Sequence, residues 1–261
     1  MRIVRFTPGP DAGLGQDPLF GVLEDDATIS IISGDPIYSG IQKTAAKIEL
    51  NKVRLLAPII PRSKVVCVGK NYADHAAEMG GVVPDEPIIF LKPNTSVIGP
   101  NDTIVWPDMS ERIDHEAELA IVIGRICKDV PVERVNDVIF GYTIANDVTA
   151  RDLQKKDGQW TRAKGFDTFC PIGPWVDTDF IPGTQKITAT IAGEVKQSAQ
   201  ISDMIFDVPT IVNFVSRVMT LLPGDIILTG TPAGIGPMVA GEKATMAIEG
   251  LGELTNKVSA K

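Results

Sequence analysis

The sequence contains no long apolar run. Its 261 residues are 44% hydrophobic, yet the hydrophobic residues are dispersed among short segments. A membrane-spanning helix needs roughly 20 consecutive, predominantly apolar residues, so no membrane partner is expected. The first ten residues, MRIVRFTPGP, also lack the apolar stretch of a secretory signal. The sequence therefore favours a cytoplasmic location.

Cysteine is scarce, and positive charge is in the minority. The 3 cysteines, Cys67, Cys127 and Cys170, form no CxxC pair, which argues against a disulfide framework and for a reducing compartment. The 33 acidic residues outnumber the 25 basic ones and give a formal net charge of −8. No cluster of Lys and Arg interrupts this balance. A nucleic-acid partner is not expected, because proteins that bind nucleic acids present a basic face.

Several familiar catalytic motifs are missing as well. Gly236 and Gly241 have the glycine spacing of a phosphate-binding loop, but Glu242 stands where that loop requires Lys. The GxSxG motif of serine hydrolases and the HExxH motif of zinc proteases are both absent. These absences exclude the commonest signatures of nucleotide hydrolysis, serine catalysis and zinc proteolysis.

Short β-like segments dominate what is present. Residues 2–6, 19–23 and 28–32 indicate a small N-terminal β domain over 1–60, and Pro58 and Pro61 then separate it from a larger domain over 61–261. Further strands are expected at 64–69, 88–91, 113–124, 139–146, 187–191 and 225–229, and helices at 71–79, 131–136 and 206–222. The pattern predicts a β-rich mixed α/β fold with few short helices.

An acidic cluster, DHEAE, opens the most apolar of these strands. Glu116 and Glu118 fall on one face of an extended strand with Cα atoms about 6.5–7 Å apart, whereas His115 has the opposite parity and is expected to be structural. Two carboxylates so close repel unless a proton or a cation joins them, and a hard divalent cation suits both. Asp147, after the next strand, is a third candidate ligand. Oxygen ligands select Mg²⁺, Mn²⁺ or Ca²⁺ over Zn²⁺ or copper. A charged edge strand and an Asp-capped turn are the alternatives.

Other residues are candidates because of their chemistry. His75 and Glu78 share a face of the expected helix 71–79, so the carboxylate would make the imidazole more basic for activating water; a surface His–Glu pair is the alternative. Near a metal, Lys164 would hold or polarise a substrate oxygen, and otherwise it is a solvated charge. The backbone N–H groups and the Thr231 hydroxyl of 230–234 would cradle a carboxylate or form an ordinary turn.

At several points the sequence resembles the fumarylacetoacetate hydrolase family. The shared motifs are GKNYADH (69–75), DHEAEL (114–119), NDVTARDLQ (146–154), KGFDTF (164–169) and LTGTP (228–232). They occur in the family's order, and the resemblance extends from about residue 64 to the end of the chain. The first sixty residues resemble the variable N-terminal part of many members. The resemblance implies the family's β roll, with few short helices and a small N-terminal domain, and its habitual homodimer.

The resemblance also implies roles for individual residues. The metal ligands would be Glu116, Glu118 and Asp147, holding one Mg²⁺ or Mn²⁺ per chain, and the catalytic residues would be His75, Glu78 and Lys164. The substrate-binding residues would be Arg151, Gln154, Gly230 and Thr231. His75 and Glu78 would lie on a lid, and the part of this lid near residues 79–86 is expected to set specificity.

The implied partner is a small anionic 2-oxo acid. The metal would chelate its C1 carboxylate and C2 oxygen and stabilise the pyruvate enolate released when the C3–C4 bond breaks. The presence of both His75 and Glu78 favours this cleavage, of an acylpyruvate such as fumarylpyruvate or of oxaloacetate. The first alternative is isomerisation of 2-hydroxyhepta-2,4-diene-1,7-dioate in aromatic catabolism. The second is a non-catalytic binding module whose cation only ties strands together.

Overall fold

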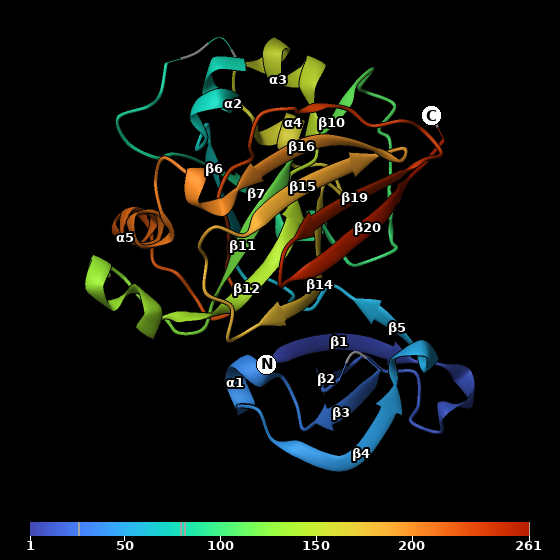
Figure 1. The fold of residues 1–261 in the computed structure, drawn as a ribbon. Coiled ribbons are helices and arrows are strands. Elements are labelled where there is room, and N and C mark those ends of the chain that lie inside the picture. Colours follow the sequence, from blue (N-terminus) through green and yellow to red (C-terminus); the bar gives the residue numbers. More distant parts are fainter. Residues whose placement is uncertain (26, 79, 81, 261) are drawn as a thin grey trace.

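The computed structural model describes residues 1–25, 27–78, 80 and 82–260, and strands dominate among them (Figure 1). The largest sheet contains β1 (Arg2–Pro8), β2 (Leu19–Leu23), β3 (Thr28–Ile32), β4 (Lys43–Glu49), β5 (Val53–Leu56), β6 (Val65–Gly69), β7 (Ile88–Lys92), β8 (Val97–Ile98), β11 (Ala117–Ile123), β12 (Ile139–Asn146), β14 (Cys170–Asp177) and β17 (Ile226–Leu228). A second sheet contains β9 (Thr103–Ile104), β15 (Lys186–Ile191), β16 (Glu194–Gln200), β19 (Lys243–Ile248) and β20 (Gly252–Val258), and a third contains β10 (Ile113–His115), β13 (Thr149–Ala150) and β18 (Gly236–Pro237).

The helices are few and short, as the sequence predicts. They are α1 (Pro36–Ser39), α2 (Ala73–Glu78), α3 (Arg151–Asp157), α4 (Thr161–Lys164) and α5 (Val208–Val218), with 3-10 turns at Pro10–Ala12, Leu50–Lys52, Asn94–Ser96, Val132–Asp137 and Ile201–Asp203. Within the described ranges, each helix is too short or too polar to cross a bilayer. The expected β-rich mixed fold is confirmed.

The large sheet joins the two ends of the molecule. Its strand order is β4-β3-β2-β1-β14-β12-β11-β17-β6-β7, with β5 paired to β1 and β8 paired to β14. The second sheet, in the order β16-β15-β19-β20-β9, packs across β11 and β12 (Figure 1). The pair β6–β17 is parallel, although the strands lie far apart in the sequence.

A small N-terminal domain is formed by β1 to β5 and α1, and it protrudes below the larger body in Figure 1. It has its own apolar cluster, which includes Val4, Phe6, Ile29 and Ile48. Its first strand nevertheless pairs with β14, with Ile3 opposite Val176, so one sheet runs through both parts. The division into 1–60 and 61–261 stays a prediction from the sequence.

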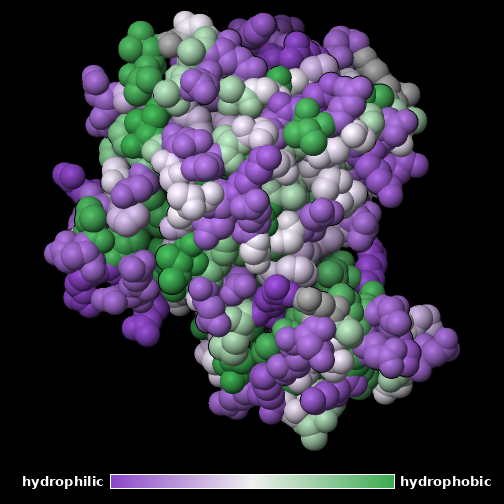
Figure 2. Space-filling view, viewed as in Figure 1, coloured by the Kyte–Doolittle hydropathy of each residue, from purple (hydrophilic) through white to green (hydrophobic). Residues whose placement is uncertain are grey.

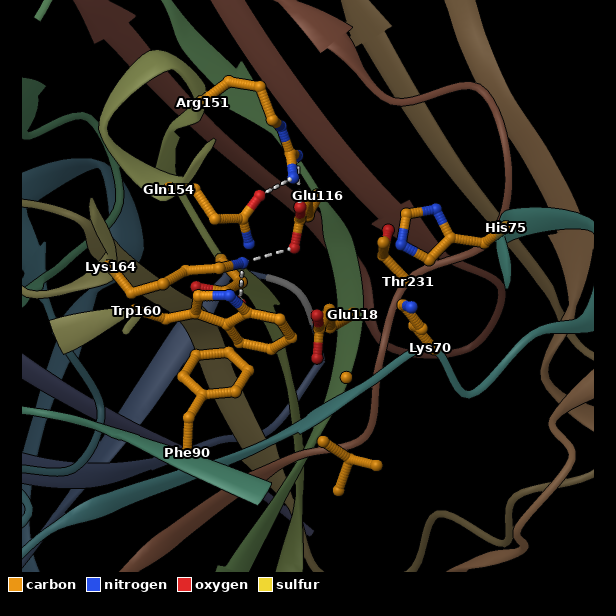
Figure 3. A pocket seen from close by; sticks show the side chains of 13 residues that line it. Lys70, His75, Phe90, Glu116, Glu118, Arg151, Gln154, Trp160, Lys164 and Thr231 are labelled. Atoms are coloured by element: carbon orange, nitrogen blue, oxygen red, sulfur yellow. Dashed lines mark hydrogen bonds and ion pairs between the residues drawn. The ribbon is translucent and has the colours of Figure 1, made fainter. Parts of the chain in front are cut away.

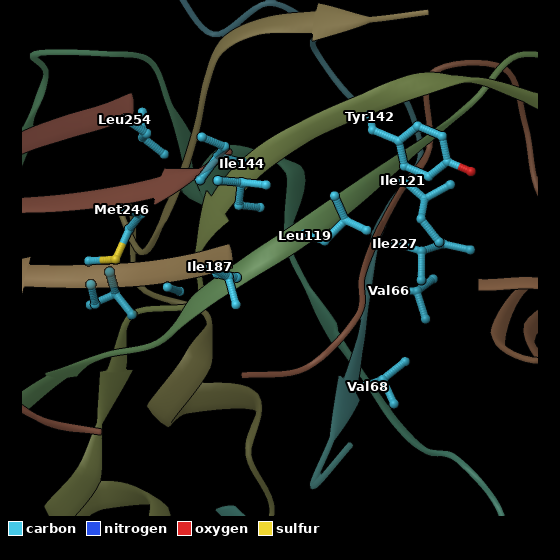
Figure 4. Packing of buried hydrophobic residues seen from close by; sticks show 14 of the residues in the cluster. Val66, Val68, Leu119, Ile121, Tyr142, Ile144, Ile187, Ile227, Met246 and Leu254 are labelled. Atoms are coloured by element: carbon cyan, nitrogen blue, oxygen red, sulfur yellow. The ribbon is translucent and has the colours of Figure 1, made fainter. Parts of the chain in front are cut away.

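The apolar composition of β11 follows from burial on both of its faces. All seven of its residues are buried. Leu119 and Ile121 point into the cluster between the two sheets, whereas Ala120 and Val122 belong to the cluster on the opposite side. The first cluster also contains Ile144, Ile187, Met246 and Leu254 (Figure 4). Alternation with period 2 is hidden in the sequence because both faces need apolar side chains.

Two local predictions are wrong. The single strand expected at 113–124 is broken at Glu116 into β10 and β11, because the peptide N–H of Glu116 bonds to the Asn146 side chain instead of a neighbouring strand. The helix expected at 71–79 begins only at Ala73. Met79, the last residue of that prediction, lies outside the described residues, as does Gly81.

The surface in Figure 2 is mostly hydrophilic, with apolar residues in small groups. This matches the acidic composition, in which charged residues make up 22% of the chain. The main candidate for function is therefore an internal pocket, at the upper end of β11 and β12 in Figure 1.

Candidate active site

Three carboxylates meet where strands end. Glu118 comes from β11, Glu116 from the break between β10 and β11, and Asp147 directly follows β12. All three are buried, and each offers an oxygen within 4.8 Å of the oxygens of the other two. The break at Glu116 positions them, because the Asp147 N–H donates to the Glu116 carbonyl at 2.9 Å. The residues singled out by the E-x-E spacing and by the Asp after β12 thus form one cluster.

Basic side chains surround two of these carboxylates. The Lys164 Nζ lies 2.7 Å from Glu116 Oε2 and 2.6 Å from Asp147 Oδ2, and Arg151 also pairs with Glu116 (Figure 3). Burial alone would raise the pKa of Glu116, but attraction to Lys164 and Arg151 outweighs burial and holds it well below its usual range. Burial would likewise lower the pKa of Lys164, but Asp147 and Glu116 raise it.

Glu118 is in a different electrostatic position. Its Oε2 accepts a hydrogen bond of 2.6 Å from the Gly230 N–H, and no basic side chain pairs with it among the described residues. Burial, together with repulsion from Asp147 and Glu116, raises its pKa well above the usual value. A buried Glu–Glu–Asp set with one uncompensated carboxylate fits a divalent cation, since such an ion takes oxygen ligands and supplies the missing charge.

His75 and Glu78 face this cluster from α2. His75 is buried and points toward Glu116 and Thr231 (Figure 3). Its Nδ1 lies 3.4 Å from Glu78 Oε2, and the same carboxylate accepts from the Gly234 N–H at 3.2 Å. Glu78 is therefore held between the helix and the turn after β17. A carboxylate on Nδ1 selects the tautomer whose Nε2 accepts a proton.

The expected substrate-binding residues do not all face the pocket. Arg151 and Gln154 do, and the Arg151 Nη1 donates to Gln154 Oε1 at 2.6 Å. Thr231 lines the pocket, but its hydroxyl donates to the Ala117 carbonyl at 3.0 Å and accepts from the Gln197 amide at 2.8 Å. The Gly230 N–H is used by Glu118. His115, expected to be structural, lines a separate cavity beside Gly236.

The sequence analysis missed Lys92. This lysine ends β7, is 1% exposed, and donates from Nζ to Asp147 Oδ1 at 2.6 Å and to the Val148 carbonyl at 3.1 Å. A lysine at the end of an apolar strand normally reaches solvent, so nothing in its local sequence indicated burial. Only the position of Asp147 beside β7 explains it.

The pocket also has an apolar wall that the motifs did not indicate. Phe90 of β7 and Trp160, just before α4, pack edge to face with ring centroids 5.1 Å apart. The Lys164 Nζ lies 5.0 Å from the centroid of Phe90 (Figure 3). Such a wall restricts access of water to the buried charges, which strengthens every electrostatic interaction beside it.

Comparison with known proteins identifies the family. Residues 64–259 match the family described as Fumarylacetoacetate (FAA) hydrolase C-terminal, and residues 1–58 match Rv2993c-like, N-terminal. The chain belongs to the fumarylacetoacetate hydrolase family, as the motifs predict. It is 60% identical to Protein Rv2993c of Mycobacterium tuberculosis over 231 residues, which is 87% of this chain and 85% of that protein. It is 43% identical to the mitochondrial oxaloacetate tautomerase Fahd2a of Rattus norvegicus over 219 residues, which is 80% of this chain and 70% of that protein.

Solved structures agree on the fold. The 5-carboxymethyl-2-hydroxymuconate delta-isomerase from Mycobacterium smegmatis is 48% identical, with a TM-score of 0.91 and 100% of each chain covered. The fumarylpyruvate hydrolase from Pseudomonas aeruginosa is 34% identical, with a TM-score of 0.73, covering 80% of this chain and 92% of that one. That hydrolase was solved in complex with Mn²⁺ and pyruvate. The chain is therefore a fumarylacetoacetate hydrolase family enzyme with an acidic metal site.

Proposed function

We propose that this enzyme uses Mg²⁺ or Mn²⁺ to cleave a C–C bond in a small 2-oxo acid, an acylpyruvate or oxaloacetate, and so releases pyruvate. The observation that carries the proposal is the buried His75, paired with Glu78 and directed at the three-carboxylate cluster. A metal site without a base would suffice for polarising a substrate. A base beside it supplies what hydrolysis additionally needs, a group that takes a proton from water.

The side chains of the pocket have separate roles in the proposed reaction. A metal held by Glu116, Glu118 and Asp147 would supply Lewis-acid stabilisation of the negative charge that develops when the C3–C4 bond breaks. His75 Nε2 takes a proton from the water that attacks the C4 carbonyl and later returns it to the leaving carbon. Arg151 holds Gln154 Oε1, which leaves the Gln154 amide N–H groups to donate to the substrate's carboxylate. Lys164 fixes the spacing of two carboxylates and adds positive charge for an anion.

The test is pyruvate release from oxaloacetate, acetylpyruvate and fumarylpyruvate with Mg²⁺ or Mn²⁺, with and without a chelator. Glu118→Gln runs alongside, because free metal ions decarboxylate oxaloacetate unaided. Pyruvate that requires both the metal and Glu118 supports the proposal. A protein that melts higher with Mn²⁺ yet releases pyruvate from none of these acids would exclude the cleavage and leave the isomerase or the non-catalytic module.

His75→Ala separates the base from the metal site. We expect this variant to bind Mn²⁺ as the wild type does and to lose roughly 10²- to 10⁴-fold in acylpyruvate hydrolysis, the usual contribution of a general base. Isothermal titration with Mn²⁺ and initial rates of pyruvate release measure the two effects. Hydrolysis at the wild-type rate would remove His75 from the mechanism.

A second candidate is isomerisation or tautomerisation at the same site. The observation that favours it is the 48% identity to a muconate delta-isomerase, above the 34% identity to the fumarylpyruvate hydrolase. The mitochondrial relative from Rattus norvegicus is named as an oxaloacetate tautomerase. His75 would then move a proton between substrate carbons with no water consumed. NMR of the products distinguishes a rearranged acid from pyruvate.

A further inference from the structure

Lys70 occupies an unusual backbone conformation at the edge of the pocket. It directly follows β6 and has a φ of 55°, in the left-handed region that residues with a Cβ seldom adopt. Its half-buried side chain lines the same pocket as the acidic cluster. Strained residues of this kind concentrate at functional sites, where the surrounding structure holds them in place.

The next residue, Asn71, keeps the backbone of Lys70 in this conformation. The Asn71 side chain donates to the Phe206 carbonyl at 3.0 Å and to the Thr229 carbonyl at 2.7 Å, and it accepts from the Phe206 N–H at 2.7 Å. Three hydrogen bonds, one of them buried and two partly buried, therefore fix the backbone beside Lys70. A glycine would take this φ freely, but it would present no charge to the pocket.

The charge of Lys70 is not used by the protein. Lys164 and Arg151, the other basic residues that line the pocket, are bound to carboxylates of the cluster. Lys70 makes no hydrogen bond or ion pair with any of the residues that the structure describes. A flexible ammonium group that stays half-buried without a partner is available to an anionic ligand.

The position of Lys70 defines which part of a ligand it can reach. In Figure 3, Lys70 lies with His75 and Thr231 on one side of the glutamates, whereas Lys164 and Gln154 lie on the other. A substrate whose 2-oxo acid end faces Gln154 extends its acyl end toward His75 and Lys70. The acyl end is where acylpyruvates differ from one another.

We infer that Lys70 binds a second carboxylate, carried beyond the C4 carbonyl, so that the preferred substrates are dianionic acylpyruvates. The inference rests on the proposed function. It also ranks oxaloacetate below the dianionic acylpyruvates as a substrate. Oxaloacetate loses its second carboxylate as carbon dioxide, and an ion pair with Lys70 would stabilise that group in the ground state. A fumarylpyruvate-like acid keeps its distal carboxylate through the reaction.

The test compares Lys70→Met with Lys70→Arg on two substrates. Fumarylpyruvate carries the distal carboxylate and acetylpyruvate does not. For Lys70→Met we expect kcat/KM for fumarylpyruvate to fall roughly 10- to 100-fold, mostly through KM, as when a hydrogen bond to a charged group is lost. We expect acetylpyruvate to change less than about 3-fold and Lys70→Arg to retain most of the activity on both. Lys47→Met, in the exposed part of β4, is the matched control.

The outcomes of this test distinguish the role of Lys70 from the proposed pyruvate-releasing activity. Equal losses on both substrates would assign Lys70 to the C4 carbonyl or to the fold and overturn the inference, as would no loss on either. Wild-type enzyme that releases pyruvate from neither substrate would overturn the proposed function, and the inference with it. Mn²⁺ titration of Lys70→Met, expected to match the wild type, shows whether the metal site is intact.

Discussion

Glu118 is the carboxylate of the cluster that the neighbouring basic residues neutralise least. Its raised pKa reflects burial and repulsion from Asp147 and Glu116. Glu118→Gln keeps the shape and the bond from Gly230 but removes the charge. In metal-free buffer we expect the thermal midpoint to rise by roughly 2–4 °C, about 1 kcal/mol for a chain of this size.

The same substitution should weaken Mn²⁺ binding at least about 10-fold, because it removes a charged ligand. Calorimetric melting and isothermal titration measure the two effects, and Glu253→Gln, an exposed carboxylate on β20, should alter neither. A variant that melted below the wild type without metal would contradict this description of Glu118.

The burial of Lys92 and its ion pair with Asp147 could not be predicted from the local sequence. Lys92→Met leaves the buried Asp147 with Lys164 alone, and removal of one partner from a buried pair is strongly destabilising. We expect the free energy of unfolding to fall by about 3 kcal/mol in metal-free buffer. Urea unfolding measures it, with exposed Lys186→Met as the control. A loss below about 1 kcal/mol would mean that Lys164 alone compensates Asp147.

At the level of elements, the sequence predicted about half of the described strands, and the ends of the strands were less predictable. Alternation and turn residues located β2, β3 and β12, since these signals are local. The break at Glu116 was not predictable, because it depends on Asn146, thirty residues later in the chain. The E-x-E spacing nevertheless identified the correct glutamates. The converging carboxylates come from a broken strand and not from one face of a regular one.

Asn71 links three elements, which the sequence alone did not indicate. Its hydrogen bonds connect the end of β6 to Phe206 before α5 and to Thr229 after β17. Asn71→Ala removes the partner of the buried Thr229 carbonyl and of two partly buried Phe206 backbone groups, so we expect a loss of about 2–4 kcal/mol in the free energy of unfolding. The substitution should also reduce kcat, because Asn71 directly precedes the segment that leads into α2, and α2 carries the proposed base His75.

Urea unfolding and initial rates measure the two effects of this substitution. The control is Asn136→Ala, in the exposed 3-10 turn Val132–Asp137, which should change neither. Wild-type activity in a destabilised Asn71→Ala variant would separate the position of α2 from this hydrogen-bond network.

At the scale of the whole molecule, the arrangement of strands lay beyond the reach of the sequence. Local patterns indicate β1, but not that it pairs with β14, more than 170 residues away. The family resemblance supplied what local patterns could not, namely the roll and the association of β11, β12 and the turn after β17. Because one sheet passes through the N-terminal domain and the body, we expect the two parts to unfold together, so that stabilisation at the active site stabilises both.

This continuity gives a prediction about metal removal. At a Mn²⁺ concentration about 100 times the dissociation constant, binding adds about 2.7 kcal/mol, which corresponds to roughly 5–10 °C in the thermal midpoint. Trp160 lies beside the site, and Trp175 lies at the junction with β1, where the Arg2 guanidinium is 4.9 Å from its ring. Variants in which Trp160 or Trp175 is the single remaining tryptophan, with Trp106 also replaced, should show the same melting temperature in tryptophan fluorescence and shift together when Mn²⁺ is added. A chelator should reverse both shifts, and Glu118→Gln should reduce each to about half or less. A shift at Trp160 alone would mean that the N-terminal domain unfolds independently, despite the pairing of β1 with β14.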